Sequence, residues 1–148
     1  MNNRVVITGM GTVSPLGLDV PSSWQGLIGG KSGVDHISLF DASEFDVKIA
    51  AEVKGFDPAQ YIGRKDSRRM DRFTQFAVAA SLEAVENARL QIDQSNANDI
   101  GVIIGSGMGG LITLSEQFKV LSEKGADRVS VFLIPMMIAD MAPGQVSI

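Results

Sequence analysis

The stretch VIIGSGMGG, residues 102–110, contains glycines whose spacing could serve a chemical purpose. Gly105, Gly107 and Gly110 have the GxGxxG spacing of a turn that binds the phosphates of a dinucleotide. That chemistry requires a turn that leaves the first strand of a βαβ unit. It also requires an acidic residue at the end of the next strand, about 20 residues on, to bind the ribose. A dinucleotide-binding domain is therefore one hypothesis for this chain.

The surroundings of the loop weaken that hypothesis. The loop follows the third predicted strand, and the nearest acidic residues, Glu123 and Asp127, fall at a helix end and in the loop after it. Two other interpretations remain open. The glycines could permit tight turning and close packing of backbones. Alternatively, Gly107 and Gly109 could flank Met108 so that its flexible apolar side chain projects into a cavity.

Positive charge is concentrated in the stretch RKDSRRMDR, residues 64–72, within a chain of net charge −4. Five of the 13 Lys and Arg residues lie there, although the acidic balance argues against general nucleic-acid binding. One interpretation is a solvated helix start whose charge is balanced by Asp66 and Asp71. The other is a surface that binds a local acidic partner.

The composition limits the other kinds of site. The chain has no Cys and one His, His36, which excludes disulfides, thiolate metal sites and multi-histidine metal sites. We interpret His36 as a surface or capping residue. No Ser/His/Asp set or pair of carboxylates suggests catalysis. No run of about 18 apolar residues predicts a membrane span, and no signal peptide is recognisable, so we expect a cytoplasmic protein.

Strands and helices that alternate along the chain predict an α/β architecture. Asp19 is the expected cap of the first helix, Gly29 and Gly30 its stop, and Gly125 the stop of the third helix. The chain ends on an apolar segment, so we expect it to be truncated and poorly folded on its own. The predicted strands are 4–11, 47–56 and 100–107, the helices are 20–30, 71–88 and 110–125, and a further apolar segment covers 131–148.

The second of these helices carries a stripe of small residues. Its apolar positions recur at helical spacing and are dominated by alanine, which lets a helix approach its neighbours closely. We therefore predict a central, largely buried helix. The stripe consists of Phe73, Phe76, Ala77, Ala80, Ala84 and Ala88.

Four stretches together resemble the N-terminal part of a β-ketoacyl-acyl-carrier-protein synthase of the synthase II type. They are RVVITGMGTVSPLG, RKDSRRMDRFTQFAVAAS, IGSGMGG and FLIPMMIADMAPGQVSI. The resemblance covers the whole chain. It implies a thiolase-like fold, layered α-β-α-β-α when complete, with residues 1–148 as its N-terminal domain, cut before the expected nucleophile. It also implies a homodimer and a chain well over twice this length.

The resemblance gives the glycine loop a role at an acyl pocket rather than at a phosphate. Met108 matches the position that limits or opens the fatty-acyl tunnel, where Ile is frequent in the family. Leu133 and Ile134 match the stretch that reaches the dimer interface and helps to close the partner's pocket. From composition alone, both residues would be interpreted as ordinary core.

The same resemblance favours a partner for the basic cluster. Lys65, Arg68 and Arg69 match positions that dock the acidic helix of acyl carrier protein. A second basic site of the family is degraded here, because Asp127 precedes Arg128 where two basic residues are expected.

The chemistry that the resemblance implies is decarboxylative condensation of an acyl group with malonyl-carrier protein. The family uses a Cys nucleophile at a helix N-terminus and two His residues, with no metal or organic cofactor. None of these catalytic residues lies within this chain, so we expect the fragment to be inactive. The alternative within the family is a non-catalytic chain-length partner that lacks the Cys.

Overall fold

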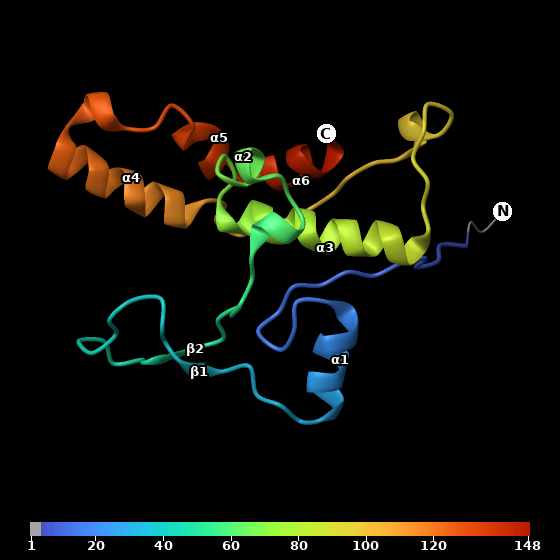
Figure 1. Cartoon of the computed structure of the whole chain (residues 1–148), viewed down its shortest axis with the longest axis horizontal. Helices are drawn as coiled ribbons and strands as arrows, with labels where there is room; N and C mark the ends of the chain where they lie inside the picture. The colour runs from blue at the N-terminus through green and yellow to red at the C-terminus, as the bar shows by residue number, and fades with distance from the viewer. Residues whose placement is uncertain (1–3) are drawn as a thin grey trace. The chain divides into compact units, whose positions relative to one another are not determined.

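The computed structural model describes residues 4–148 (Figure 1), which form two compact units. Unit 1 contains the chain up to Asp57 together with residues 80–90, and unit 2 contains residues 58–79 and 91–148. The α-helices are α1 (Val20–Ile28), α2 (Arg64–Ser67), α3 (Arg72–Ala88), α4 (Leu111–Lys124), α5 (Leu133–Met137) and α6 (Met141–Ser147). The strands are β1 (Asp35–His36) and β2 (Ile49–Ala50), and the short 3-10 helices are η1 (Pro58–Gln60), η2 (Ala97–Asp99) and η3 (Ala126–Arg128).

The predicted helices are confirmed because their signals are local. Asp19 accepts a hydrogen bond from the Ser22 amide at 2.7 Å and caps α1. Hydrogen bonding from the Ser22 side chain, and then from its amide, lowers the pKa of the Asp19 carboxyl. Gly29 ends α1 as predicted. Gly125 ends α4 with a φ of +85°, a backbone conformation that favours glycine.

Two of the three predicted strands are wrong for the described residues. Residues 4–11 and 100–107 carry no strand assignment, and β2 keeps two residues of the predicted strand at 47–56. The reason is that a strand needs hydrogen bonds from a neighbouring strand, and the part of the chain from residue 4 onward supplies none here. Ile7 and Ile103, which are 84% and 98% exposed, show how open both segments are.

Helix α3 is less buried than its alanine stripe predicts. Thr74 and Ala79 are its buried residues, and all six positions of the stripe are half-buried. The prediction of a close backbone approach is nevertheless correct in unit 1. A Cβ atom at Gly9 would collide with the carbonyl oxygen of Ala84, and one at Gly11 would collide with that of Ala80. The N-terminal trace therefore runs along the last turns of α3 (Figure 1).

Glu83 fastens this contact with one carboxylate. Its Oε2 accepts from the Thr12 amide at 2.8 Å, and its Oε1 accepts from the Val20 amide at 2.7 Å. Both ends of the loop between the N-terminal segment and α1 are thus tied to the same side chain of α3. Charge-assisted bonds of this kind are the stronger class of hydrogen bond in proteins.

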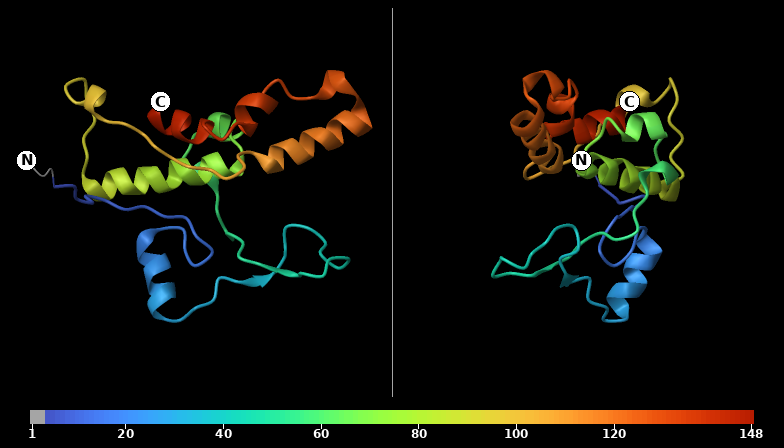
Figure 2. Two further views of the ribbon diagram at one scale, coloured as in Figure 1. Left: turned by 180° about the vertical axis from the view of Figure 1, so that it is seen from behind. Right: turned by 60° about the vertical axis from the view of Figure 1, so that its left-hand side comes forward.

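Unit 2 is built on helices. In Figure 2, α4 and α5 lie close together, and α4 also packs against η3. The Gln117 side chain accepts from the Ser130 amide at 2.7 Å and holds the segment before α5 onto α4. Ile62, Met70, Ala79 and Ala142 are the buried apolar residues of this unit. Among residues 4–148, no helix has both the length and the apolar character needed to cross a bilayer.

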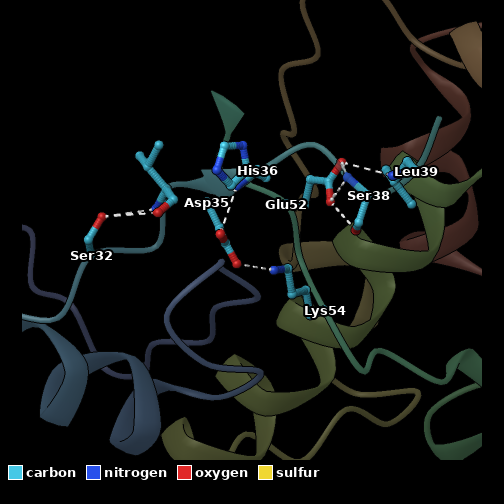
Figure 3. A network of polar contacts seen from close by, with 8 residues as sticks. Ser32, Asp35, His36, Ser38, Leu39, Glu52 and Lys54 are labelled. Carbon is cyan, nitrogen blue, oxygen red and sulfur yellow. Dashed lines mark hydrogen bonds and ion pairs between the residues drawn. The ribbon is translucent and has the colours of Figure 1, made fainter. Parts of the chain in front are cut away.

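A network of polar contacts links the two sides of the β1–β2 ribbon of unit 1 (Figure 3). The Lys54 ammonium lies 2.6 Å from Asp35, and the Glu52 carboxylate accepts from the hydroxyl and the amide of Ser38. The hydrogen bond from Lys54, helped by the His36 amide, lowers the pKa of Asp35, and the same contact raises the pKa of Lys54. The Ser38 hydroxyl is the main cause of the lowered pKa of Glu52.

These shifts predict a pH window for the order of the ribbon. Because the pKa values of Asp35 and Glu52 are lowered, their ionised carboxylates stabilise the ribbon at pH values above their ordinary pKa of about 4. This stabilisation is lost as the pH falls through the lowered pKa values. The raised pKa of Lys54 adds support below about 10.4, which disappears as the pH rises through the raised value. NMR titration should show Lys54→Met bringing the pKa of Asp35 back toward its ordinary value. Lys48→Met, on the same ribbon, should not, and equal effects of the two variants would contradict the assignment.

Candidate functional site

The glycine loop makes its closest contact with the end of α5. A Cβ atom at Gly109 would collide with the carbonyl oxygen of Met137, and one at Gly110 would collide with that of Met136. Gly109 also has a φ of +73°, a backbone conformation that residues with a side chain rarely adopt. The Gly110 amide donates to the Met137 carbonyl at 2.8 Å. The absence of side chains at Gly109 and Gly110 therefore permits close contact between the loop backbone and the backbone of α5.

The other two glycines of the GxGxxG pattern behave differently. Within residues 4–148, no atom lies within 4 Å of a Cβ built at Gly105 or Gly107. Met108, between the two kinds of glycine, is 74% exposed. Of the two open interpretations, close backbone packing thus applies to one end of the loop. The other end leaves the Met108 side chain uncovered by the described residues.

Several backbone amides between the glycine loop and the first turn of α4 already have hydrogen-bond partners within unit 2. The Gly109 amide donates to the Ser106 hydroxyl at 3.0 Å, and the Gly110 amide donates to Met137. The Thr113 amide, in the first turn of α4, donates to the Asp71 carboxylate at 2.8 Å. A pyrophosphate needs free amides and a positive field at this helix start, whereas here a carboxylate occupies it. The geometry therefore argues against the dinucleotide hypothesis.

Asp71 takes part in two helix starts. Its Oδ2 accepts from Thr113 of α4, and its Oδ1 lies 3.4 Å from the Phe73 amide at the start of α3. The residue is 4% exposed. The interpretation that Asp71 balances the basic cluster at the surface is therefore wrong, because its carboxylate is turned inward. Its position directly before α3 is the sequence signal of a helix cap that could have revealed this role.

The basic cluster presents its charges to solvent. Lys65, Arg68 and Arg69 are exposed, while Ser67, before the two arginines, and Met70, after them, are buried. The Gln75 side-chain amide of α3 donates to the carbonyls of Ser67 and Met70 at 2.9 and 3.1 Å. The turn that carries the cluster is therefore hydrogen-bonded to α3.

Arg69 connects this cluster to the segment that carries the remaining predicted site residues. Its guanidinium lies 4.8 Å from the ring centroid of Phe132, a cation–π contact. Phe132 directly precedes α5, in which Leu133 is half-buried and Ile134 is 56% exposed. Unit 2 thus brings together the basic cluster, α5 and the Met108 loop (residues 105–110). Phe132, directly before α5, contacts Arg69, and the end of α5 contacts Gly109 and Gly110.

His36 lies in β1 of unit 1 and is exposed, in agreement with its interpretation as a surface residue. Across the described residues, no group of three or more His, Asp or Glu side chains is placed to hold a metal ion. The features that converge in unit 2 are an exposed cationic surface and apolar side chains beside a backbone-packed loop.

Comparisons with known proteins agree with this picture. Residues 2–148 match the family description "Beta-ketoacyl synthase, N-terminal domain". The chain is 50% identical over 147 residues to 3-oxoacyl-acyl-carrier-protein synthase 2 of Staphylococcus aureus (strain COL), which covers 99% of this chain and 36% of that protein. It is 48% identical over 145 residues to the synthase 2 of Synechocystis sp. (strain ATCC 27184 / PCC 6803 / Kazusa), covering 98% and 35%. The chain therefore spans about a third of the length of the curated relatives it matches.

A solved structure gives the same result for the fold. It is a type II polyketide synthase acyl-carrier protein in complex with its ketosynthase bound to the hexaketide. The match has a TM-score of 0.80 and 25% identity, and it covers 99% of this chain and 38% of that one. The α/β class and the thiolase-like fold predicted from the sequence are confirmed by this likeness.

The glycine loop provides a direct test of the backbone contact. Gly109→Ala should lower the free energy of unfolding by at least about 1–2 kcal/mol, because alanine disfavours a left-handed backbone and its Cβ would meet Met137. Gly105→Ala is the matched control, in open space, and should change stability by less than about 0.5 kcal/mol. The measurement is thermal or urea unfolding of the full-length protein carrying each substitution. Equal losses would mean that the contact with α5 does not hold the loop.

Proposed function

Because this chain belongs to the β-ketoacyl synthase family through its N-terminal domain, we propose that it is part of a 3-oxoacyl-acyl-carrier-protein synthase that elongates fatty acyl chains. The observation that carries the proposal is 50% identity, over nearly the whole chain, to synthases of that name. This similarity also favours an enzyme over a non-catalytic chain-length partner. The proposed reaction joins an acyl group to a malonyl unit held on acyl carrier protein, with loss of CO2.

The composition indicates which functions of the proposed enzyme this chain can supply. The chain has no Cys, and its one His lies on the surface ribbon. The nucleophilic thiol and the His pair expected for this family would therefore come from outside these 148 residues. Within the proposal, this chain supplies recognition surfaces, and no metal or organic cofactor takes part, because the thioester provides the activation.

The exposed basic cluster is proposed to dock the carrier protein. Three cations, Lys65, Arg68 and Arg69, stand on a turn that Gln75 holds against α3. The solved relative described above is itself a ketosynthase complex with an acyl-carrier protein. Opposite charges at the rim of an interface raise the association rate more than the affinity. The cluster therefore suits a partner that must bind and leave in every cycle.

The Met108 loop and the start of α5 are proposed to form part of the acyl pocket. Met108 is exposed on a loop whose next two residues pack on the end of α5, and Leu133 and Ile134 lie on that helix. A methionine suits a wall that must accept chains of different shape, because it is unbranched and flexible. We further propose a homodimer in which Leu133 and Ile134 help to close the partner's pocket, and a cytoplasmic location.

Full-length protein incubated with acyl- and malonyl-carrier proteins should form 3-oxoacyl-carrier protein, and failure to do so would refute the proposed reaction. Arg68→Glu should raise KM for the carrier-bound substrate roughly tenfold at low salt, because steering by charge is lost. The effect should shrink at 0.15 M salt, where the Debye length is about 8 Å. Lys48→Glu, which carries the same charge change on the ribbon of unit 1, is the control. If both variants behave alike across the salt series, the cluster is not the dock.

Met108→Phe should discriminate against long substrates. Overpacking an apolar site costs about 1–3 kcal/mol, which lowers the use of long acyl groups about five- to more than a hundredfold. Short acyl groups, which stop before the obstruction, should be affected much less. The volume-conserving Met108→Leu variant is the control and should behave nearly like the wild type. A loss of elongation that is uniform across acyl lengths would point to general misfolding, and no loss at any length would place Met108 away from the pocket.

A further inference from the structure

The start of α4 has a structural requirement that the proposed function does not explain. The first amides of a helix have no partner inside the helix and are usually satisfied by a side chain at the N-cap. In α4 the N-cap is Gly110, which has no side chain and no room for one, because a Cβ there would collide with the Met136 carbonyl. The contact between the loop and α5 therefore prevents α4 from having a cap of its own.

Asp71, which lies directly before α3, supplies the missing cap. Its Oδ2 accepts from the Thr113 amide at 2.8 Å, although the two residues lie 42 positions apart in the chain. The Thr113 side is equally enclosed, since that residue is 5% exposed. A carboxylate at a helix N-terminus also gains from the positive end of the helix dipole. Burial strengthens such a contact and makes its loss costly.

The position of Asp71 matters because of the residues that precede Thr113 in the chain. Gly110 and Gly109 pack against the end of α5, and Met108 comes directly before them. Asp71 also lines a groove of about 200 Å³, together with Phe73, Phe76, Leu111 and other residues of unit 2. Asp71 thus joins the start of α3 to the loop on which the proposed acyl-pocket residue stands.

We infer that Asp71 is a positioning residue that caps α4 from α3 and so sets the place of the Met108 loop and the acyl-length preference of the enzyme. This inference rests on the proposed function for its link to acyl length. Asp71 acts through the Thr113 amide, and Asn at the same position would keep an oxygen acceptor while losing the charge.

Amide hydrogen exchange and kinetics on the full-length synthase test the inference together. Asp71→Ala should speed exchange at Thr113 and in residues 106–112 about tenfold or more, because a charge-assisted hydrogen bond is lost. It should also change the ratio of kcat/KM for long against short acyl chains at least about fivefold. Asp71→Asn should restore most of both quantities. Asp99→Asn, an exposed carboxylate of the same unit, is the control for charge and should change neither.

The outcomes separate a positioning role from a merely structural one. Equal loss of activity at every acyl length, or unchanged exchange at Thr113, would overturn the inference. If Asp71→Ala does not fold, Asp71→Asn decides: a few-fold faster exchange with a shift in the length ratio supports the inference, and identity to the wild type in both refutes it. If Met108→Phe shifts the ratio but the folded Asp71 variants do not, the inference fails while the proposed function stands. If Met108→Phe shifts nothing, the pocket assignment fails on its own account.

Discussion

The contact between two backbones, Gly109–Gly110 and the carbonyls of Met136 and Met137, is the constraint on which the candidate site depends. Close packing of this kind is possible only where a side chain is absent. It joins the loop before α4 to the end of α5, and α5 begins beside the ring that Arg69 covers. One steric requirement therefore fixes the neighbourhood of the loop, of α5 and, through Phe132, of the basic cluster.

The same constraint decides which chemistry the loop can support. Because no side chain fits at Gly110, the polar groups around it are satisfied by Ser106, by the Met137 carbonyl and by Asp71. These bonds occupy three amides near the start of α4 and place a carboxylate at the helix N-terminus, where a phosphate would otherwise be favoured. A loop with dinucleotide spacing instead packs on α5 and carries one exposed methionine. The spacing of glycines alone does not distinguish the two uses.

Unit 1 also combines a close backbone contact at glycines with hydrogen bonds from a carboxylate. Gly9 and Gly11 let the N-terminal segment lie against the carbonyls of Ala84 and Ala80, and Glu83 then satisfies amides at both ends of the following loop. In each unit a glycine pair sets the distance between backbones, and a carboxylate on or beside α3 supplies the hydrogen bonds that the glycines cannot. Asp71 and Glu83 are therefore structural partners of glycine loops rather than members of a solvated charged face.

The sequence by itself determined the helices, the caps at Asp19 and Gly125, the exposed basic cluster and the family, because periodicity, capping and motif order are local or cumulative signals. It did not determine the strands at 4–11 and 100–107, since β-branched residues predict a strand but only a neighbouring strand can complete one. Nor did it determine where Asp71 points. Next to five cations in the sequence it resembled a surface counter-charge. Only the tertiary structure placed the start of α4, with its uncapped amide and its glycine N-cap, within reach of that carboxylate.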